Sequence, residues 1–274
     1  MTIAEAISQS PVSVHRRDAE LLLAHVLAQP RTWVLAHPEA PLTDTEQASF
    51  LTLIQRRVEG TPLQYLLGLQ EFYGLELRVT PDALIPRPET ELLVEAVIAW
   101  SRKRLKPMNM LDIGTGTGAI ALALAANEPM LEVLATDISP SALQLARDNA
   151  LRLGLNDRVR FLESDLFSSL EPGLLFDAIV SNPPYIPAGD ATTMQREVVE
   201  HEPHLALFAG PDGLAIYRRL IPLAWESLRM EGLLALEFGY GQADAMRDLL
   251  YGWRNVRILN DYAGIPRIAL ANRD

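Results

Sequence analysis

Apolar residues recur along this chain with two different spacings, and the change between them divides the sequence. Up to about residue 60 the spacing is helical. Apolar residues between 21 and 27 fall on one face of a helix that is expected to start near Ser13, and a second helix is expected from Thr43 to Gly60. The segment from Gln29 to Pro41 separates the two helices. We therefore expect a small all-α unit over residues 1–62.

Beyond this unit the pattern becomes one of short apolar runs between helical stretches. Residues 72–79 alternate around Gly74 as a hairpin does, and a proline-rich extended segment follows. From Met108 onward strands and helices alternate, which predicts an α/β fold with a parallel, doubly wound sheet and an antiparallel end. Strands are expected over residues 110–113, 131–135, 159–162, 176–180, 233–238, 256–259 and 267–270, and helices over 92–100, 119–126, 139–152, 213–229 and 244–250.

Composition and charge narrow the class of protein. The absence of cysteine excludes disulfides and thiolate metal sites, and His15, His25 and His37 are not at metal-ligand spacing, so no metal is expected. The net charge of −11 argues against a protein that wraps a polyanion. The basic cluster at residues 102–106 is explained by the end of a helix. With no apolar run of about 18 residues and no secretion signal, a cytoplasmic protein is expected.

The turn Ser181-Asn182-Pro183-Pro184-Tyr185 follows an expected buried strand. Its two prolines cannot continue a sheet ladder, so the strand must end there, at the edge where open α/β sheets bind ligands. Asn182 offers an amide in a fixed plane, the prolines leave carbonyls with no N–H of their own, and Tyr185 offers a flat face. The turn predicts a site for a planar NH2 group. The alternative is a proline-terminated strand with a capping Asn.

A glycine-rich loop predicts a second ligand-binding element. Gly114, Gly116 and Gly118 lie between an expected strand and helix, where a side chain would block a ligand's approach to the backbone. Asp137 closes the next strand, where a carboxylate can bind both hydroxyls of a ribose. The glycine spacing fits a dinucleotide as well as another ribose-bearing cofactor, because Ala119 also satisfies the dinucleotide pattern.

Two further features favour a cofactor other than a dinucleotide. Asp165 closes the third strand, where it would accept a hydrogen bond from an adenine amino group. The turn at Asn182 suits a nitrogen nucleophile but contains no general acid, which a dehydrogenase would need. Arg87, Glu89 and Thr90 are polar groups at an expected helix start, and they either cap that helix or face a ligand.

The glycine loop and the proline turn together carry a family resemblance. Residues 112–118 with Asn182-Pro183-Pro184-Tyr185 resemble class I S-adenosylmethionine-dependent methyltransferases that modify amide or exocyclic nitrogens. More narrowly, the chain resembles the protein-(glutamine-N5) methyltransferases of the HemK family. The stretches that carry this second resemblance are 64–68, 71–74, 84–91 and 202–207. With the helical N-terminal unit, the likeness covers nearly the whole chain.

The resemblance implies a cofactor and a set of roles. The cofactor is S-adenosylmethionine, with S-adenosylhomocysteine as product and no metal. The implied cofactor-binding residues are Gly114, Thr115, Gly116, Thr117, Gly118, Asp137, Asp165, Leu166 and Asn182, and the residues expected to contact cofactor or substrate are Arg87, Glu89 and Thr90. Leu166 stands where the family commonly has an aromatic residue, and Tyr73 stands where Trp is frequent.

The same resemblance implies the substrate and the catalytic turn. Asn182, Pro183 and Tyr185 are the expected catalytic residues, and with Pro184 they bind the substrate amide. The side-chain oxygen of Asn182 and the carbonyl of Pro183 would accept its two N–H bonds, while Tyr185 packs on its plane. Family members that act on class I peptide chain release factors methylate the glutamine of their Gly-Gly-Gln loop, which is the substrate expected here.

Domain organisation and partners follow from that reading. Residues 1–62 are expected to recognise the substrate, 63–90 to form a linker with the hairpin, and 91–274 to form the methyltransferase domain. A monomer is expected, with a protein substrate and no direct binding to nucleic acid or membrane. The alternatives are a glutamine of a ribosomal protein, adenine N6 of nucleic acid, a non-enzymatic adenosine-binding module and an NAD-dependent enzyme.

Overall fold

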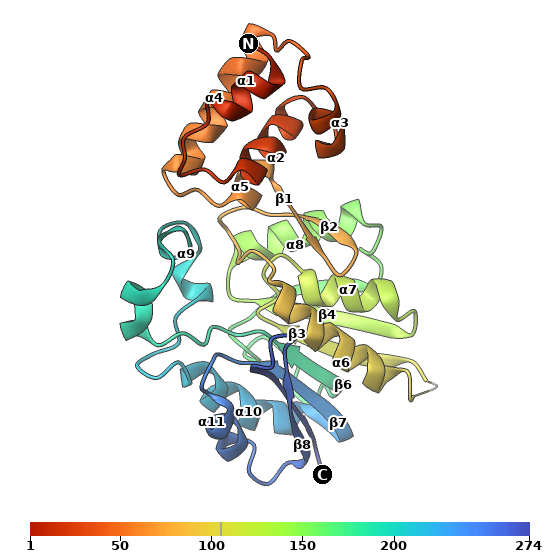
Figure 1. Cartoon of the computed structure of the whole chain (residues 1–274). Coiled ribbons are helices and arrows are strands. Elements are labelled where there is room, and N and C mark those ends of the chain that lie inside the picture. The colour runs from red at the N-terminus through yellow and green to blue at the C-terminus, as the bar shows by residue number, and fades with distance from the viewer. Residues whose placement is uncertain (105) are drawn as a thin grey trace. The chain divides into compact units, whose positions relative to one another are not determined.

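The computed structural model describes residues 1–104 and 106–274, and these form two compact units (Figure 1). One unit comprises Met1–Leu69 together with Gln195–His201. The other comprises Gln70–Met194 together with Glu202–Asp274 and contains a seven-stranded sheet. We call them the helical unit and the sheet unit.

The helical unit is a set of short helices around a separate apolar core. Its helices are α1 (Ile3–Ser8), α2 (Arg16–Val26), α3 (Arg31–Ala36), α4 (Asp44–Val58), α5 (Leu63–Leu67) and α9 (Arg196–His201). Leu22 and Leu23 of α2 and Phe50 and Ile54 of α4 are buried in this core. Capping boxes start α1 at Thr2 and α4 at Thr43.

The two helices predicted from apolar periodicity are confirmed as α2 and α4. The predicted start of the first near Ser13 was wrong by a few residues, because His15 caps α2 and its ring accepts from the backbone N–H of Arg17 (3.2 Å). The interpretation of residues 29–41 as a separator alone was also wrong, since they contain α3. Helices of five or six residues are too short to show periodicity.

An arginine of α4 holds the segment 195–201 within the helical unit. Arg57 Nε donates to Asp18 (2.9 Å), and Arg57 Nη1 donates to Glu197 of α9 (2.6 Å). All three side chains are largely shielded from water, which strengthens both ion pairs relative to exposed ones. A stretch more than a hundred residues along the chain therefore belongs to the N-terminal fold.

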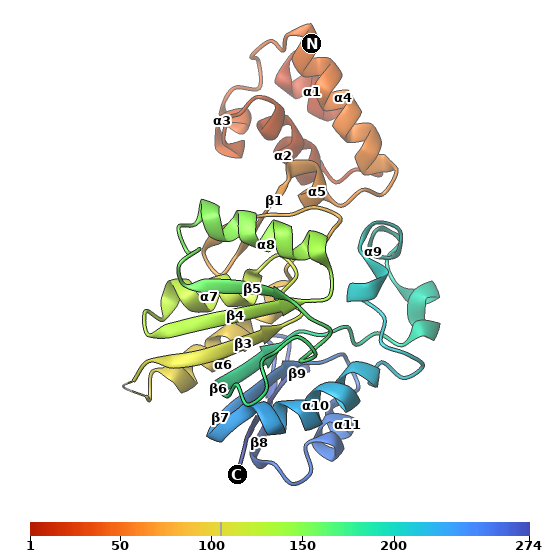
Figure 2. The ribbon, with the colours of Figure 1, turned by 180° about the vertical axis from the view of Figure 1, so that it is seen from behind.

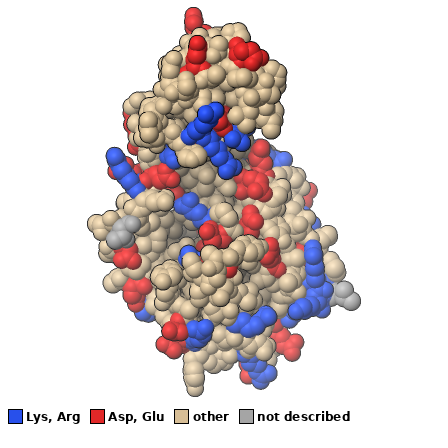
Figure 3. Space-filling model, viewed as in Figure 1, with Lys and Arg blue, Asp and Glu red and all other residues tan. Residues whose placement is uncertain are grey.

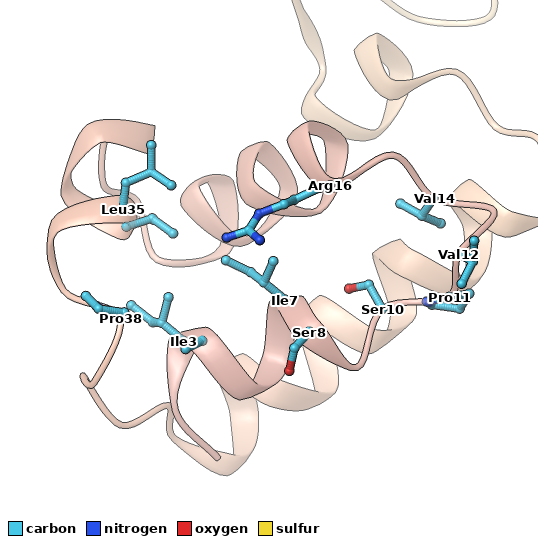
Figure 4. A pocket seen from close by; sticks show the side chains of 12 residues that line it. Ile3, Ile7, Ser8, Ser10, Pro11, Val12, Val14, Arg16, Leu35 and Pro38 are labelled. Carbon is cyan, nitrogen blue, oxygen red and sulfur yellow. The ribbon is translucent and has the colours of Figure 1, made fainter.

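The helical unit also contains a cavity of about 450 Å³ (Figure 4). Its wall is mostly apolar, with Ile3 and Ile7 from α1 and Val34 and Leu35 from α3, and Arg16 lies at its side. The cavity shares no residue with the strand ends described below.

The sheet unit has helices on both faces of a mostly parallel sheet (Figure 2). Its strands are β1 (Leu69–Phe72), β2 (Leu75–Arg78), β3 (Met108–Ile113), β4 (Leu131–Asp137), β5 (Val159–Glu163), β6 (Phe176–Ser181), β7 (Leu228–Glu237), β8 (Arg254–Asn260) and β9 (Pro266–Asn272). Its helices are η1 (Pro88–Thr90), α6 (Glu91–Ser101), α7 (Ala119–Asn127), α8 (Pro140–Arg152), η2 (Ala188–Thr193), η3 (His204–Ala206), α10 (Ala215–Ser227) and α11 (Ala243–Leu249).

The large sheet has the strand order β5-β4-β3-β6-β7-β9-β8, in which β9 runs antiparallel to both neighbours. Strands β1 and β2 pair separately as the predicted hairpin. Successive side chains of a strand point to opposite faces. Met110 of β3 accordingly belongs to the core under α6 and α7, whereas Leu111 belongs to the core under α10 and α11. This two-sided burial explains why residues 110–111 of β3 and 178–180 of β6 are unbroken apolar runs.

The predicted α/β fold with an antiparallel end is confirmed; most boundaries differ by one to three residues, and one differs by five. The strand predicted to begin at residue 233 begins at Leu228, and α10 ends at Ser227. The part of β7 that the prediction missed contains the polar residues Arg229 and Glu231, and Glu231 has a left-handed backbone (φ 61°). A register shift in the pairing of β6 with β7 accommodates it, so the apolar pattern starts late.

Among the residues that the structure describes, no helix is long and apolar enough to cross a membrane.

A buried asparagine joins three segments of the sheet unit. The Asn149 side chain of α8 accepts from Arg78 N (2.8 Å) and donates to Arg78 O and Thr117 O (both 3.0 Å).

Replacing Asn149 with Ala would leave these backbone groups unpaired, so we expect the free energy of unfolding to fall by about 2–4 kcal/mol in urea titrations. Asn127→Ala, which removes one part-buried bond of an exposed residue, is the control. Equal effects of the two substitutions would contradict this role.

Candidate active site

Strand register brings the candidate residues to one edge of the sheet. Ile113 of β3 lies opposite both Thr136 of β4 and Ser181 of β6, and Ser181 lies opposite Leu236 of β7. Since these strands are parallel, the residues that follow them emerge together. The glycine loop, Asp137, the Asn182 turn and Glu237 therefore share this edge, which Figure 1 shows at the ends of β3, β4, β6 and β7.

The glycine loop adopts a conformation that only glycine accepts readily. Gly114, Gly116 and Gly118 all have left-handed backbones, with φ of 71°, 55° and 85°. Among the described residues other than Gly114 and its two chain neighbours, no heavy atom lies within 4 Å of where a Gly114 Cβ would be, whereas at Gly118 a Cβ would meet Leu122 at 3.0 Å. Gly118 thus serves helix packing, and Gly114 leaves open space beside the backbone.

A buried carboxyl group holds the glycine loop from the interior of the fold. The side chain of Asp112 lies inside the fold and accepts a hydrogen bond from Thr115 Oγ1 (2.6 Å). Burial raises the pKa of Asp112 to about 7, against the opposing effect of the Thr115 bond. Thr115 and Thr117 are themselves buried, so both support the loop from inside.

Asp137 ties the loop to the end of β4. One carboxylate oxygen accepts from Gly116 N (2.8 Å) and the other from Ser139 N (2.9 Å). Burial raises the pKa of Asp137 although both bonds oppose the shift. Each oxygen keeps a lone pair, which is the arrangement that a vicinal diol requires.

These residues fit a ribose-bearing cofactor. The open side of Gly114 gives a ligand access to the backbone, and the carboxylate of Asp137 is held at the next strand end. Asp165 is exposed and paired with Arg219 of α10 (2.7 Å), which fixes one oxygen and leaves the other to accept. The side chain of Leu166 is 8% exposed and packs into the core with Ile113, so only its edge reaches the surface.

The Asn182 turn is held by a short hydrogen-bonded chain. Asn182 Nδ2 donates to Thr90 Oγ1 (3.0 Å), and Thr90 Oγ1 donates to Glu237 Oε2 (2.7 Å). Thr90 and Glu237 are 4% and 1% exposed and lie 147 residues apart in the chain. Thr90 is the N-cap of α6 but makes no side-chain capping bond, so the capping interpretation was wrong for this residue.

Tyr185 and the backbone of the turn are held by the loop after β7. Tyr185 OH lies 3.5 Å from Glu237 Oε1, and Tyr185 O accepts from Gln242 Nε2 (3.0 Å). A Cβ at Gly213 would lie 2.1 Å from Tyr185 O, and one at Gly239 would lie 2.9 Å from the Tyr185 ring. Both glycines are therefore required for close approach to the turn.

The predicted contacts at Arg87 and Glu89 have different surroundings. Arg87 Nη2 donates to the buried carboxylate of Glu202 (2.5 Å), so this guanidinium takes part in an internal ion pair. Glu89 is exposed. The segment that follows the turn pairs with the one that follows Glu202, through Ile186 N to Leu207 O (3.0 Å). This pairing gives the block 202–207 a structural role beside the turn.

Sequence reasoning missed Glu237 and Gln242. Glu237 closes an apolar run, Leu233 to Leu236, and a carboxyl group in that position was a signal that could have been used. Gln242 follows Gly239-Tyr240-Gly241, and nothing in that local sequence indicates a bond to residue 185. The structure brings Thr90, Asn182, Tyr185 and Glu237 into one cluster, whereas Arg87 pairs elsewhere.

The mostly parallel seven-stranded sheet with one antiparallel strand is the class I methyltransferase fold, and the family matches show that the chain is an enzyme of this class. The methyltransferase small domain family matches residues 88–206, and the PrmC N-terminal domain family matches residues 2–68. A 16S rRNA methyltransferase from T. thermophilus has the same fold, with a TM-score of 0.55 and 21% identity over 75% of this chain and 50% of that chain.

Curated relatives define the family more narrowly. Release factor glutamine methyltransferase from Koribacter versatilis is 45% identical over 94% of this chain and 91% of its own. The enzyme of that name from Salmonella typhimurium is 46% identical over 92% and 90%. The chain belongs to the family of release factor glutamine methyltransferases.

The buried carboxyl of Glu237 predicts a pH dependence of stability. Burial raises its pKa from 4.5 to about 7, while the Thr90 bond and the charge of Arg267 oppose the shift. The folded state therefore holds a proton that the unfolded state releases between these values. The free energy of unfolding should fall as pH rises from about 4.5 to about 7 and then level off. Asp112 contributes in the same direction.

Glu237→Gln should reduce this fall, by about 2–3 kcal/mol between pH 5 and pH 8. Urea unfolding at both pH values measures the difference. The control is Glu132→Gln, at an exposed position of β4, which should leave the pH dependence unchanged. A Glu237→Gln variant whose stability falls as steeply as that of the unsubstituted protein would contradict the raised pKa.

Proposed function

We propose that this protein transfers a methyl group from S-adenosylmethionine to the side-chain amide nitrogen of the glutamine in the Gly-Gly-Gln motif of class I peptide chain release factors. The names of the relatives support the substrate. The observation that carries the chemistry is the bond from Asn182 Nδ2 to Thr90. It uses one N–H of the Asn182 amide, which sets the orientation of the amide and leaves its oxygen to accept from a substrate N–H.

The turn would hold the substrate amide by both hydrogens. Among the described residues, no donor bonds to Asn182 Oδ1, so this oxygen can accept one N–H, and the carbonyl of Pro183 would accept the other. Tyr185 would pack on the amide plane, with Pro184 fixing the distance between them. An amide nitrogen is a weak nucleophile because its lone pair is delocalised. Orienting that lone pair and stabilising positive charge on nitrogen is therefore the protein's main contribution.

The cofactor, when bound, supplies an activated methyl group on a positively charged sulfur, and a neutral thioether leaves. We assign Gly114 to Gly118 to its amino-acid end, Asp137 to the ribose hydroxyls, and Asp165 with Leu166 to the adenine. No strong base is required, because a protonated N-methyl amide loses its proton to water. We assign Arg87 and Glu89 to contacts with the cofactor or the substrate, and the ion pair with Glu202 holds the Arg87 side chain.

We further propose that residues 1–62 recognise the protein substrate, with 63–90 as linker and 91–274 as the catalytic domain, and that the enzyme is a cytoplasmic monomer with no direct contact to nucleic acid. Acidic and basic side chains are interspersed on the face in Figure 3. Within the basic cluster, Arg102 pairs with Glu128 and Lys106 with Asp177. Such internally paired charges favour a protein substrate over a polyanion.

Asn182→Ala should lower the rate of methyl transfer by about 10²–10³-fold, because one acceptor for the substrate amide is lost. Binding of S-adenosylmethionine, measured by calorimetry, should change by only a few-fold. Asn156→Ala, at an exposed position of the sheet unit, should change neither quantity. Parallel loss of cofactor binding and transfer in Asn182→Ala would show that the residue serves the cofactor instead.

The proposed substrate is tested by incubating the enzyme and isotopically labelled S-adenosylmethionine with three acceptors: a class I release factor, ribosomal large-subunit proteins and duplex DNA. Label in the release factor alone is the expected result. Label in a ribosomal protein would move the same chemistry to another glutamine, and label in DNA adenine alone would overturn the protein substrate.

A further inference from the structure

The hydrogen bonds that link Asn182, Thr90 and Glu237 can run in either direction, and the protonation state of Glu237 decides which. A threonine hydroxyl has a single hydrogen to donate and lone pairs to accept. An ionised Glu237 can only accept, so the Thr90 hydrogen must point to it over the 2.7 Å contact. The Thr90 oxygen is then available to accept, and over 3.0 Å it selects the NH2 end of the Asn182 amide.

Protonation of Glu237 permits the opposite direction. A neutral carboxyl group can donate to Thr90, whose own hydrogen is then free to turn toward Asn182 and bond to the amide oxygen. The Asn182 amide would rotate to present its NH2 group to the substrate. Two N–H groups would then face each other, and the substrate amide would lose one acceptor.

We propose that Glu237 and Thr90 are positioning residues that keep the oxygen of Asn182 toward the substrate nitrogen, and that this orientation requires Glu237 to be ionised. The inference rests on the proposed function, since it takes an amide nitrogen as the group to be held. It adds two residues outside the Asn-Pro-Pro-Tyr turn to the machinery of transfer.

The same carboxylate also reaches the aromatic side chain of the turn. Glu237 Oε1 lies 3.5 Å from Tyr185 OH. The backbone carbonyl of Glu237 accepts a hydrogen bond from Tyr217 OH of α10 (2.6 Å). Burial, together with the charge of Glu237, raises the pKa of both phenols, so they remain protonated donors at neutral pH. The Glu237 carboxylate thus orients both Asn182, through Thr90, and Tyr185, the two side chains that would contact the substrate amide.

Burial is the main reason that Glu237 ionises near neutral pH, and its neighbours modify this effect. Burial raises the pKa to about 7, and Glu89 of η1 adds to that effect. Arg267 of β9 and the bonds from Thr90 and Tyr185 act in the opposite direction. The fraction of enzyme in the active orientation should therefore rise through pH 7 and reach a plateau above it.

The test is single-turnover methyl transfer to a release factor at saturating labelled S-adenosylmethionine, between pH 5.5 and 8.5. The unsubstituted enzyme should gain activity through pH 7. Glu237→Gln and Thr90→Val should be about 10–100-fold slower at pH 8 and should lose this rise, with unchanged cofactor affinity. Thr90→Ser keeps the hydroxyl and should restore the rise with pH that Thr90→Val loses.

A matched control separates positioning from general loss of packing. Ser101→Ala removes another buried hydroxyl, at the far end of α6, and should keep the full pH profile. Glu237→Gln or Thr90→Val enzyme that retains the unsubstituted pH profile would overturn the proposal, whatever its absolute rate.

A second measurement tests, without any substrate, the relay by which the protonation of Glu237 changes the orientation of Asn182 through Thr90. The side-chain ¹H–¹⁵N signals of Asn182, assigned by their loss in Asn182→Ala, should shift as pH crosses 7 and should stay constant in Glu237→Gln. Signals that do not respond to pH in the unsubstituted protein would overturn the relay. If the signals titrate but no release factor is methylated, the proposed substrate fails while the relay stands.

Discussion

Alignment of parallel strand ends is the constraint on which the site depends. The strands β4, β3, β6 and β7 are adjacent and in register, so their carboxyl ends reach the same edge of the sheet. Backbone hydrogen bonds across four strands fix this alignment more rigidly than loop contacts could. A glycine loop, a carboxylate and a proline turn that are far apart in sequence therefore become neighbours.

The same edge of the sheet contains a buried carboxyl group, which is energetically unfavourable when it is ionised. Glu237 closes β7 inside the protein, where an ionised group is unfavourable unless donors surround it. Thr90 and Tyr185 supply those donors, and both belong to segments that shape the ligand-binding side of the sheet. Stability and activity therefore favour different protonation states of Glu237. The fold is more stable with Glu237 protonated, whereas the proposed chemistry requires it to be ionised.

Local sequence predicted the parts of the site that are continuous in the chain. The glycine loop, Asp137 and the Asn182 turn each carry a chemical signature within a few residues. Sequence marked Thr90 as a possible ligand contact and offered a signal at Glu237, but the bonds that join them to the turn could not be predicted, because these partners lie more than ninety residues apart. Asn149 was missed for the same reason, since its partners are backbone groups that sequence does not specify. The short helices α1, α3 and α5 lacked enough residues to show a period.

The atom that receives the methyl group can be identified by isotope labelling. A release factor carrying ¹⁵N in its glutamine side chains would be incubated with the enzyme and S-adenosylmethionine bearing a ¹³C methyl group. Our account predicts one methyl signal that shows one-bond ¹³C–¹⁵N coupling and disappears when the Gly-Gly-Gln glutamine is replaced by glutamate. A ¹³C methyl signal in the protein without coupling to side-chain nitrogen would contradict it.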